Sequence, residues 1–209
     1  MVLAVIPGAR SIENAEAIVA EVKDRLGGTP PVLITSDEYP AYETAIELAF
    51  GEPVPPTRGP GRPRIESERR LPEGLIDATV HKHREGHRVV AVDRRLVFGT
   101  PAGLAAALAG SEVSVGVNTS FVERQNGADR GRNARKARKT YRFSKDWRVH
   151  EAITYLTMYG SNFCWPVRTL RDKDAEGRWR VRSPAMAAVL TDHLWSWREW
   201  FTRPTVQSE

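Results

Sequence analysis

The sequence predicts an α/β fold in which strands alternate with helices. Two short runs of β-forming residues, Val2–Ile6 and Val32–Thr35, are each followed by a segment whose apolar residues recur every three or four positions. A strand–helix–strand–helix order favours a parallel pairing of the two strands, with helices on the faces of the sheet. At 209 residues, with 41% hydrophobic and 27% charged residues, the chain has the composition of an ordinary soluble globular protein and the length of one domain with an appendage.

The first helix is predicted to begin after Ser11, whose side chain can accept the free amide protons of a first turn. Its apolar positions are Ile12, Ala15, Ile18, Val19, Val22 and Leu26, and a Gly-Gly pair ends it. The strand at 32–35 leads to Asp37, and a second helix is predicted over 39–50. Sites in open α/β sheets collect beyond the carboxyl ends of strands, so Asp37 is a candidate functional residue. The alternative is that Asp37 only caps the helix that follows it.

Residues 51–75 differ from the segments on either side, since they contain six prolines and show no apolar periodicity. This composition predicts a linker or an extended insert. Within it, Arg58-Gly-Pro-Gly-Arg62-Pro63-Arg64 resembles an AT-hook, in which Arg62 and Arg64 would enter a minor groove whose negative potential attracts arginine. The alternative is a plain solvated loop.

Residues 76–82 and 88–98 are predicted to form a β-hairpin that turns at a Glu-Gly pair. The first of these strands alternates apolar with polar residues, so one of its faces is expected to be apolar. His81 and His83 share a face, but no Cys or third His lies close in sequence, so surface positions on an edge strand are favoured over metal ligation. A short helix rich in Ala and Leu is predicted over 101–109.

A single carboxylate at the head of a dense basic run marks residues 118–142. Glu123 follows three residues, 118–120, that can each cap a helix. If that helix continues, Asn126 and Arg130 share a face with Glu123, because they lie three and seven residues farther on. One face then presents an acid, an amide and a guanidinium, which suits a site where a metal and a phosphate are held side by side.

The positive charge of the chain is concentrated in this region. Between Arg124 and Arg148 there are ten Lys or Arg and two Asp, a local net charge of +8, whereas the whole chain carries +5. A localised basic stripe is typical of nucleic-acid binding. The predicted DNA contacts are Arg124, Asn126, Arg130, Arg132, Arg135, Lys136, Arg138 and Lys139. The alternative is a solvated helix face without a partner.

A further helix is predicted from Asp146, and its apolar stripe over 149–163 is expected to pack against the sheet. Three tryptophans crowd residues 195–200, where buried aromatic packing competes with stacking on nucleotide bases. The single cysteine, Cys164, cannot form an internal disulfide and is expected to be a small buried hydrophobe, which fits a reducing cytoplasmic location. No run of 18 apolar residues exists, so no membrane partner is expected.

Several of these segments together resemble the C-terminal half of insertion-sequence transposases that use an Asp-Asp-Glu triad. The matching segments are Thr35-Ser-Asp37-Glu-Tyr-Pro-Ala-Tyr42, Asn118-Thr-Ser-Phe-Val-Glu123-Arg-Gln-Asn126, Arg135-Lys-Ala-Arg-Lys-Thr-Tyr-Arg-Phe-Ser-Lys145 and Tyr159-Gly-Ser-Asn162-Phe-Cys-Trp165. The resemblance covers most of residues 2–170. It weakens in the insert at 51–75 and in the tail after residue 171.

The resemblance implies an RNase H-like mixed sheet with flanking helices over residues 1–170, and a C-terminal tail at 171–209. It implies that Asp37 and Glu123 are catalytic carboxylates that ligate Mg²⁺ or Mn²⁺. The implied function is DNA transposition, which comprises DNA binding, metal-dependent phosphodiester cleavage and strand transfer. The implied partners are the element ends and target DNA, with a homo-oligomer as the active form.

The family also places a first Asp on an earlier strand. The four acids before Asp37 all lie on the predicted first helix: Glu13, Glu16, Glu21 and Asp24. The chain is therefore expected to be an N-terminally truncated part of the catalytic domain. The alternative function is that of a non-catalytic DNA-binding remnant or a regulator of transposition.

Overall fold

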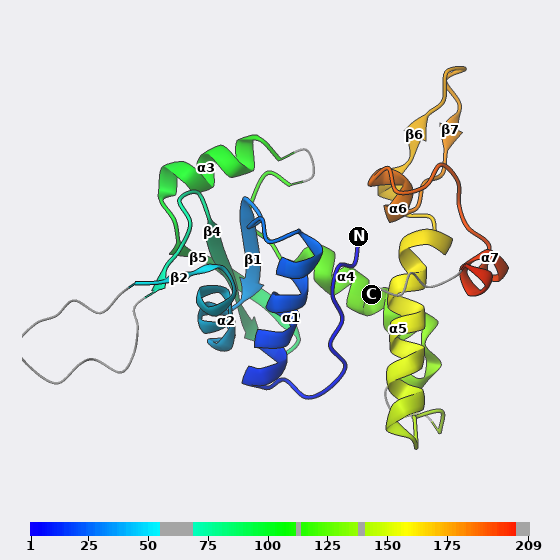
Figure 1. Ribbon diagram of the computed structural model, residues 1–209, viewed down its shortest axis with the longest axis horizontal. Coiled ribbons are helices and arrows are strands. Elements are labelled where there is room, and N and C mark those ends of the chain that lie inside the picture. The colour runs from blue at the N-terminus through cyan, green and yellow to red at the C-terminus, as the bar shows by residue number, and fades with distance from the viewer. Residues whose placement is uncertain (55–68, 112–113, 138–140, 204–209) are drawn as a thin grey trace, which may run out of the picture. The chain divides into compact units, whose positions relative to one another are not determined.

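The computed structural model describes residues 1–54, 69–111, 114–137 and 141–203 (Figure 1). Its contacts group into two units. One unit is Gly8–Arg124, and the other is Met1–Pro7 together with Gln125–Glu209. The sequence predicts a boundary after residue 170. The structure divides the chain elsewhere and groups its first residues with its C-terminal part.

The unit Gly8–Arg124 is built on a three-stranded mixed sheet. Its main elements are α1 (Ile12–Arg25), β1 (Leu33–Asp37), α2 (Ala41–Phe50), β4 (Ile76–Glu85), β5 (Arg88–Phe98), α3 (Pro101–Ala109) and the start of α4 (Ser120–Arg132). The strand order is β1–β4–β5, with β1 parallel to β4 and β4 antiparallel to β5. The predicted α/β class and the predicted hairpin are confirmed.

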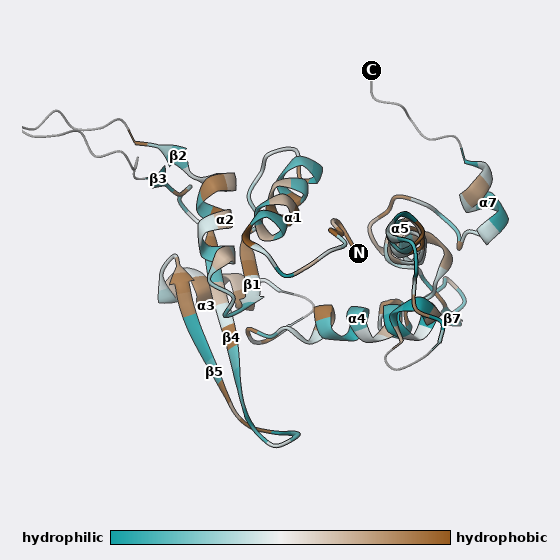
Figure 2. Cartoon of the chain, turned by 90° about the horizontal axis from the view of Figure 1, so that it is seen from below, coloured by the Kyte–Doolittle hydropathy of each residue, from teal (hydrophilic) through white to brown (hydrophobic). Residues whose placement is uncertain are grey.

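Helices cover both faces of this sheet. Ile34 of β1 packs in a cluster with Ile46 and Phe50 of α2, whereas its neighbour Leu33 packs in a cluster with Leu104 of α3. Because successive side chains of a strand point to opposite faces, α2 lies on one face and α3 on the other. Figure 2 shows that the hydropathy of β5 varies along the strand: its middle is hydrophilic, and its C-terminal end is hydrophobic.

The predicted helix starts agree with the structure where a capping side chain was identified. Ser11 caps α1 by accepting a hydrogen bond from the backbone N–H of Asn14 at 3.3 Å. The helix predicted over 39–50 begins at Ala41, and its N-cap Pro40 makes no side-chain capping bond. Asp37 is therefore the last residue of β1 and not a helix cap.

The strand predicted at Val2–Ile6 is wrong, since this segment is not a strand and lies in the other unit. The side chain of Asn162 explains the difference. It accepts a hydrogen bond from the backbone N–H of Val2 at 2.8 Å and donates one to the Val2 carbonyl at 2.8 Å. This one amide satisfies both backbone groups of Val2, which a neighbouring strand would otherwise do. Val5 is buried there.

The proline-rich insert is anchored by a small antiparallel pair of strands, β2 (Glu52–Pro53) and β3 (Arg69–Arg70). Arg69 Nη1 donates to the carbonyls of Leu48 at 3.3 Å and Gly51 at 2.9 Å, which ties β3 to the end of α2. The AT-hook prediction, with Arg62 and Arg64, lies outside the described residues.

The other unit is centred on the long helix α5. Its elements are the end of α4, η1 (Ala134–Lys136), α5 (Trp147–Cys164), η2 (Arg168–Leu170), β6 (Asp172–Lys173), β7 (Trp179–Arg180), α6 (Pro184–Ala187) and α7 (Trp197–Thr202). Phe163 of α5 lies with its ring centroid 4.6 Å from that of Trp195 and 5.4 Å from that of Trp200. Trp195 and Trp200 therefore pack against α5, in agreement with the predicted aromatic packing.

The apolar stripe of α5 is not the buried core that the sequence predicts. The buried positions of α5 are Thr154, Gly160, Ser161, Asn162 and Cys164. By contrast, Val149 is exposed, and α5 is grouped with the C-terminal segments and not with the sheet. Small and polar residues are buried because neighbouring segments approach this helix closely.

Cys164 is buried as expected, and burial raises the pKa of its thiol above the usual value. Within the parts of the chain that the structure describes, no helix is long and apolar enough to cross a membrane.

Candidate functional site

Asp37 stands at the carboxyl end of β1, in register with Val80 of β4. Its Oδ2 accepts a hydrogen bond from Arg10 Nη2 at 2.9 Å, and more than half of each side chain is exposed. The guanidinium of Arg10 also lies 4.3 Å from the ring centroid of Tyr39, whose hydroxyl donates to the Arg10 carbonyl at 3.3 Å. Asp37 is therefore an accessible carboxylate with one cationic neighbour held in place by an aromatic ring.

Glu123 lies in the first turn of α4 and is paired with Lys82 of β4. Its Oε1 also accepts a hydrogen bond from Thr119 Oγ1 at 3.0 Å. The hydrogen bond from Lys82 and the one from Thr119 hold the pKa of the Glu123 carboxyl below its usual value. Glu123 is thus ionised at neutral pH and accessible, since 55% of its side chain is exposed.

The two predicted catalytic carboxylates come to the same end of the sheet. Lys82, which holds Glu123, lies two residues beyond Val80, the register partner of Asp37. Two residues advance a strand by about 7 Å. The fold therefore brings Asp37 and Glu123, which are 86 positions apart in the sequence, to the same end of the sheet.

The start of α4 is fixed to β1 by the residues that the sequence analysis identified as caps. Thr35 Oγ1 of β1 donates to the carbonyl of Asn118 at 3.3 Å. Asn118 Oδ1 accepts hydrogen bonds from the backbone N–H of Ser120 at 3.1 Å and from its hydroxyl at 2.5 Å. These contacts join the strand that ends in Asp37 to the turn that carries Glu123.

The donor atoms at this end of the sheet fit Mg²⁺ or Mn²⁺ in kind. Mg²⁺ is commonly held by one or two carboxylates together with waters and substrate phosphates. Asp37 and Glu123 offer two exposed carboxylates, and among the described residues each has one ion-pair partner. Over the described ranges, no group of three or more His, Cys, Asp or Glu is arranged to hold a metal ion.

His81 and His83 lie on one face of β4 with ring centroids 4.4 Å apart. Each is paired with a carboxylate. His81 Nδ1 lies 2.5 Å from Glu38 Oε2, and His83 Nε2 lies 2.6 Å from Asp93 Oδ2. These contacts agree with the prediction of polar surface residues, but the predicted edge position is wrong, because β4 is the central strand of the sheet.

The predicted DNA contacts divide into two groups by their surroundings. Arg132 lies 4.2 Å over the ring centroid of Trp165, and Lys136 Nζ is 2.5 Å from Asp129 Oδ2. Both cations therefore have intramolecular partners. Arg124, Asn126, Arg130 and Arg135 are exposed, and the structure gives these three arginines no ion pair with any described residue. Arg138 and Lys139 lie outside the described residues.

Helix α4 crosses the boundary between the two units, which falls between Arg124 and Gln125. The face predicted to carry Glu123, Asn126 and Arg130 therefore spans that boundary. It stays a prediction. The confirmed part is that one helix runs from Ser120 to Arg132.

Asp129 is a buried carboxylate that the sequence patterns do not predict. Asp129 is 5% exposed and accepts hydrogen bonds from Lys136 Nζ at 2.5 Å and from Thr157 Oγ1 at 2.8 Å. The network joins the end of α4 to η1 and α5. The sequence hints at this role only through the position of Asp129, which is the one acid between Arg124 and Lys139.

A second buried carboxylate, Asp77 of β4, was also missed. Asp77 is 1% exposed, and its Oδ1 has no hydrogen-bond partner among the described residues. Burial, and secondarily the negative charge of Glu43 on α2, raise the pKa of Asp77 to about 6. The predicted polar face of this strand is covered, because residues 76–80 are buried on both faces.

Comparison of the chain with protein-family models, with curated proteins and with solved structures gave no match.

Proposed function

We propose that the chain is part of the catalytic domain of an insertion-sequence transposase, with an RNase H-like sheet, and that it binds DNA. The observation that supports the proposal is that Asp37 and Glu123 lie at the same end of the sheet. Asp37 ends β1 next to Val80, and Glu123 is held by Lys82 on the adjoining strand. Two separate sequence motifs that resemble one family thus supply carboxylates to one place.

In this proposal Asp37 and Glu123 hold Mg²⁺ or Mn²⁺ at the carboxyl end of β1. The bound metal ion would activate the attacking oxygen or stabilise the leaving oxygen of a phosphodiester. The chain's own contribution is to present both carboxylates to solvent. Thr119 orients Glu123, whereas Lys82 and Arg10 hold the two carboxylates before a metal ion takes their place.

The proposed DNA contacts are the exposed arginines of α4 and η1. Arg124, Arg130 and Arg135 are the candidates of this group that have no ion-pair partner among the described residues. A duplex offers one negative charge about every 1.7 Å along its axis, so each free guanidinium can meet a phosphate. A homo-oligomeric active form belongs to the same proposal.

A second candidate function is non-catalytic DNA binding, for example as a regulator of transposition. The observation that favours it is that each carboxylate already has a cationic partner, Arg10 for Asp37 and Lys82 for Glu123. In addition, no described acid or histidine joins these two to form a group of three. The two functions share the basic surface and differ in the metal.

The DNA-binding part is tested by measuring affinity for a labelled duplex at several salt concentrations. Each lost phosphate contact lowers the slope of log affinity against log salt by about 0.9, so Arg124, Arg130 and Arg135 changed to Gln together should lower it by about 2.7. The matched control changes three exposed arginines elsewhere in the chain: Arg88, Arg168 and Arg198. Equal slopes for the two triple variants would contradict a specific role for α4 and η1.

The metal part is tested by thermal melting with and without Mn²⁺ and by DNA cleavage with Mg²⁺. If Asp37 and Glu123 hold a metal, Mn²⁺ should raise the melting temperature of the parent and raise it less in Asp37→Asn. Metal-dependent cleavage that is lost in Glu123→Gln would support the transposase. A parent that binds DNA, shows no Mn²⁺ shift and does not cleave would favour the second candidate.

A further inference from the structure

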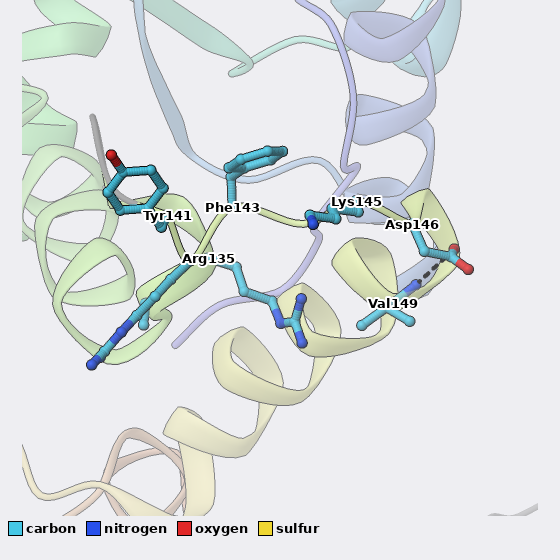
Figure 3. A pocket seen from close by; sticks show the side chains of 8 residues that line it. Arg135, Tyr141, Phe143, Lys145, Asp146 and Val149 are labelled. Carbon is cyan, nitrogen blue, oxygen red and sulfur yellow. Dashed lines mark hydrogen bonds between the residues drawn. The ribbon is translucent and has the colours of Figure 1, made fainter.

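A shallow recess of about 530 Å³ lies beside the N-terminus of α5. Arg135 of η1 lines it, together with Tyr141, Phe143 and Lys145 from the segment that follows and Val149 from the first turn of α5. Figure 3 shows Tyr141, Phe143 and Lys145 projecting from this one connecting segment. All of these residues belong to the unit that contains α5.

Hydrogen bonds join the end of the connecting segment, Ser144–Asp146, to the first turns of α5. Asp146 Oδ1 caps the helix by accepting from the backbone N–H groups of Arg148 at 2.8 Å and Val149 at 3.4 Å. One turn farther on, His150 Nδ1 lies 3.2 Å from the hydroxyl of Ser144. The segment is therefore held at its junction with the helix.

The lining combines exposed aromatic rings with cations. The Tyr141 side chain is fully exposed, and Phe143 is 55% exposed. Neither ring stacks on another described aromatic residue. Arg135 and Lys145 flank the rings, and the described part of the chain contains no ion-pair partner for either. Arg142 adds a third cation to the lining, against the single carboxylate of Asp146.

We propose that this recess holds one unpaired nucleotide of a DNA strand, an inference that rests on the proposed DNA-binding function. A nucleobase has flat apolar faces that can stack on Phe143 or Tyr141, and its phosphate is an anion for Arg135 and Lys145. The bases of an intact duplex are stacked within the helix and cannot enter. The recess therefore distinguishes DNA with an unpaired nucleotide from fully paired DNA, whereas the arginines of α4 do not.

The test compares a labelled duplex with the same duplex carrying one unpaired 2-aminopurine. We expect the parent to bind the second DNA about tenfold more tightly, because stacking of one base on an aromatic side chain contributes about that factor. The 2-aminopurine fluorescence should fall on binding. Phe143→Leu, which keeps an apolar side chain without a ring, should lose the preference and the fluorescence change.

Two further variants separate stacking from charge. Phe201→Leu is the control for an exposed phenyl ring in the same unit, since Phe201 is 65% exposed on α7, and it should keep the preference. Arg135→Gln should weaken binding of both DNAs by a similar factor. An equal preference in the parent and in Phe143→Leu would overturn the inference about the recess, as would equal binding of both DNAs by the parent. Failure of the parent to bind either DNA would instead contradict the proposed function itself.

Discussion

Replacing Asp77 by Asn should stabilise the protein at pH 8 and leave its stability almost unchanged at pH 4. Asp77 is buried in β4 under α2, and its Oδ1 has no hydrogen-bond partner among the described residues. Its pKa is raised to about 6, first by burial and then by Glu43. A group with a raised pKa in the folded state supports stability below its unfolded pKa, and that support is lost as the pH rises through the folded value.

The size of the effect follows from the two pKa values. The difference between the ordinary 3.8 and about 6 corresponds to about 3 kcal/mol at a pH well above 6, since one pKa unit is worth about 1.4 kcal/mol. Glu43 is exposed, so water screens its repulsion and part of the cost is lost. We therefore expect Asp77→Asn to gain about 2 kcal/mol at pH 8.

The assay is chemical denaturation of the parent and of Asp77→Asn at pH 4, 5, 6, 7 and 8. The difference in unfolding free energy between the two proteins cancels the titration of all other groups. It should be near zero at pH 4 and rise mainly between pH 4 and pH 7. Glu43→Gln serves as the control, because it removes only the secondary cause and should give a smaller gain in the same direction. A difference that does not change with pH would refute the reasoning.

Two other predictions concern the unit that contains α5. A Cβ added at Gly160 would lie 2.6 Å from Cζ3 of Trp197. Gly160→Ala should therefore lower the melting temperature of the parent and cost about 2 kcal/mol of unfolding free energy. In a Trp197→Ala background, where the clash is absent, Gly160→Ala should instead stabilise the protein by about 1 kcal/mol through helix propensity. Lys136→Met leaves the buried carboxylate of Asp129 without its cation and should cost about 3 kcal/mol in chemical denaturation, most of which is recovered on adding Asp129→Asn. A null effect of Lys136→Met would show that the ion pair is not formed in solution.

Local sequence signals predicted the elements that are determined by nearby residues. Ser11 and Asp146 begin helices because each accepts backbone N–H groups within three residues of itself. The hairpin turns at Gly86, whose φ of 58° suits a residue without a side chain. Asp37 was placed at a strand end for a similar reason, since an apolar run directly precedes it.

The errors come from contacts between residues far apart in the sequence. Val2–Ile6 has the composition of a strand, but the side chain of Asn162, 160 positions away, takes over the hydrogen bonds of Val2. Asp77 has the alternation of a surface residue, but α2 covers that face of the sheet. Lys136 is a different case: it is predicted as a DNA contact, but Asp129, seven residues before it, holds its side chain. Periodicity describes one element at a time and carries no information about which element covers it.

The side chains of Arg10 and Lys82 affect how readily Asp37 and Glu123 could bind a metal ion. Both acids are exposed, so water already stabilises their charge, and the pairs with Arg10 and Lys82 contribute little to folding. The pairs therefore matter mainly as competitors for a metal ion. A divalent cation that binds two carboxylates gains more electrostatic energy than two separate monovalent side chains do, and displaced Lys82 and Arg10 can then meet a phosphate. Without a metal ion, the positive charges of Arg10 and Lys82 stay next to the two carboxylates and offset their repulsion of DNA. The two proposed functions, catalysis and plain DNA binding, would thus differ in whether a metal ion displaces these two side chains, and for that reason the Mn²⁺ response separates them.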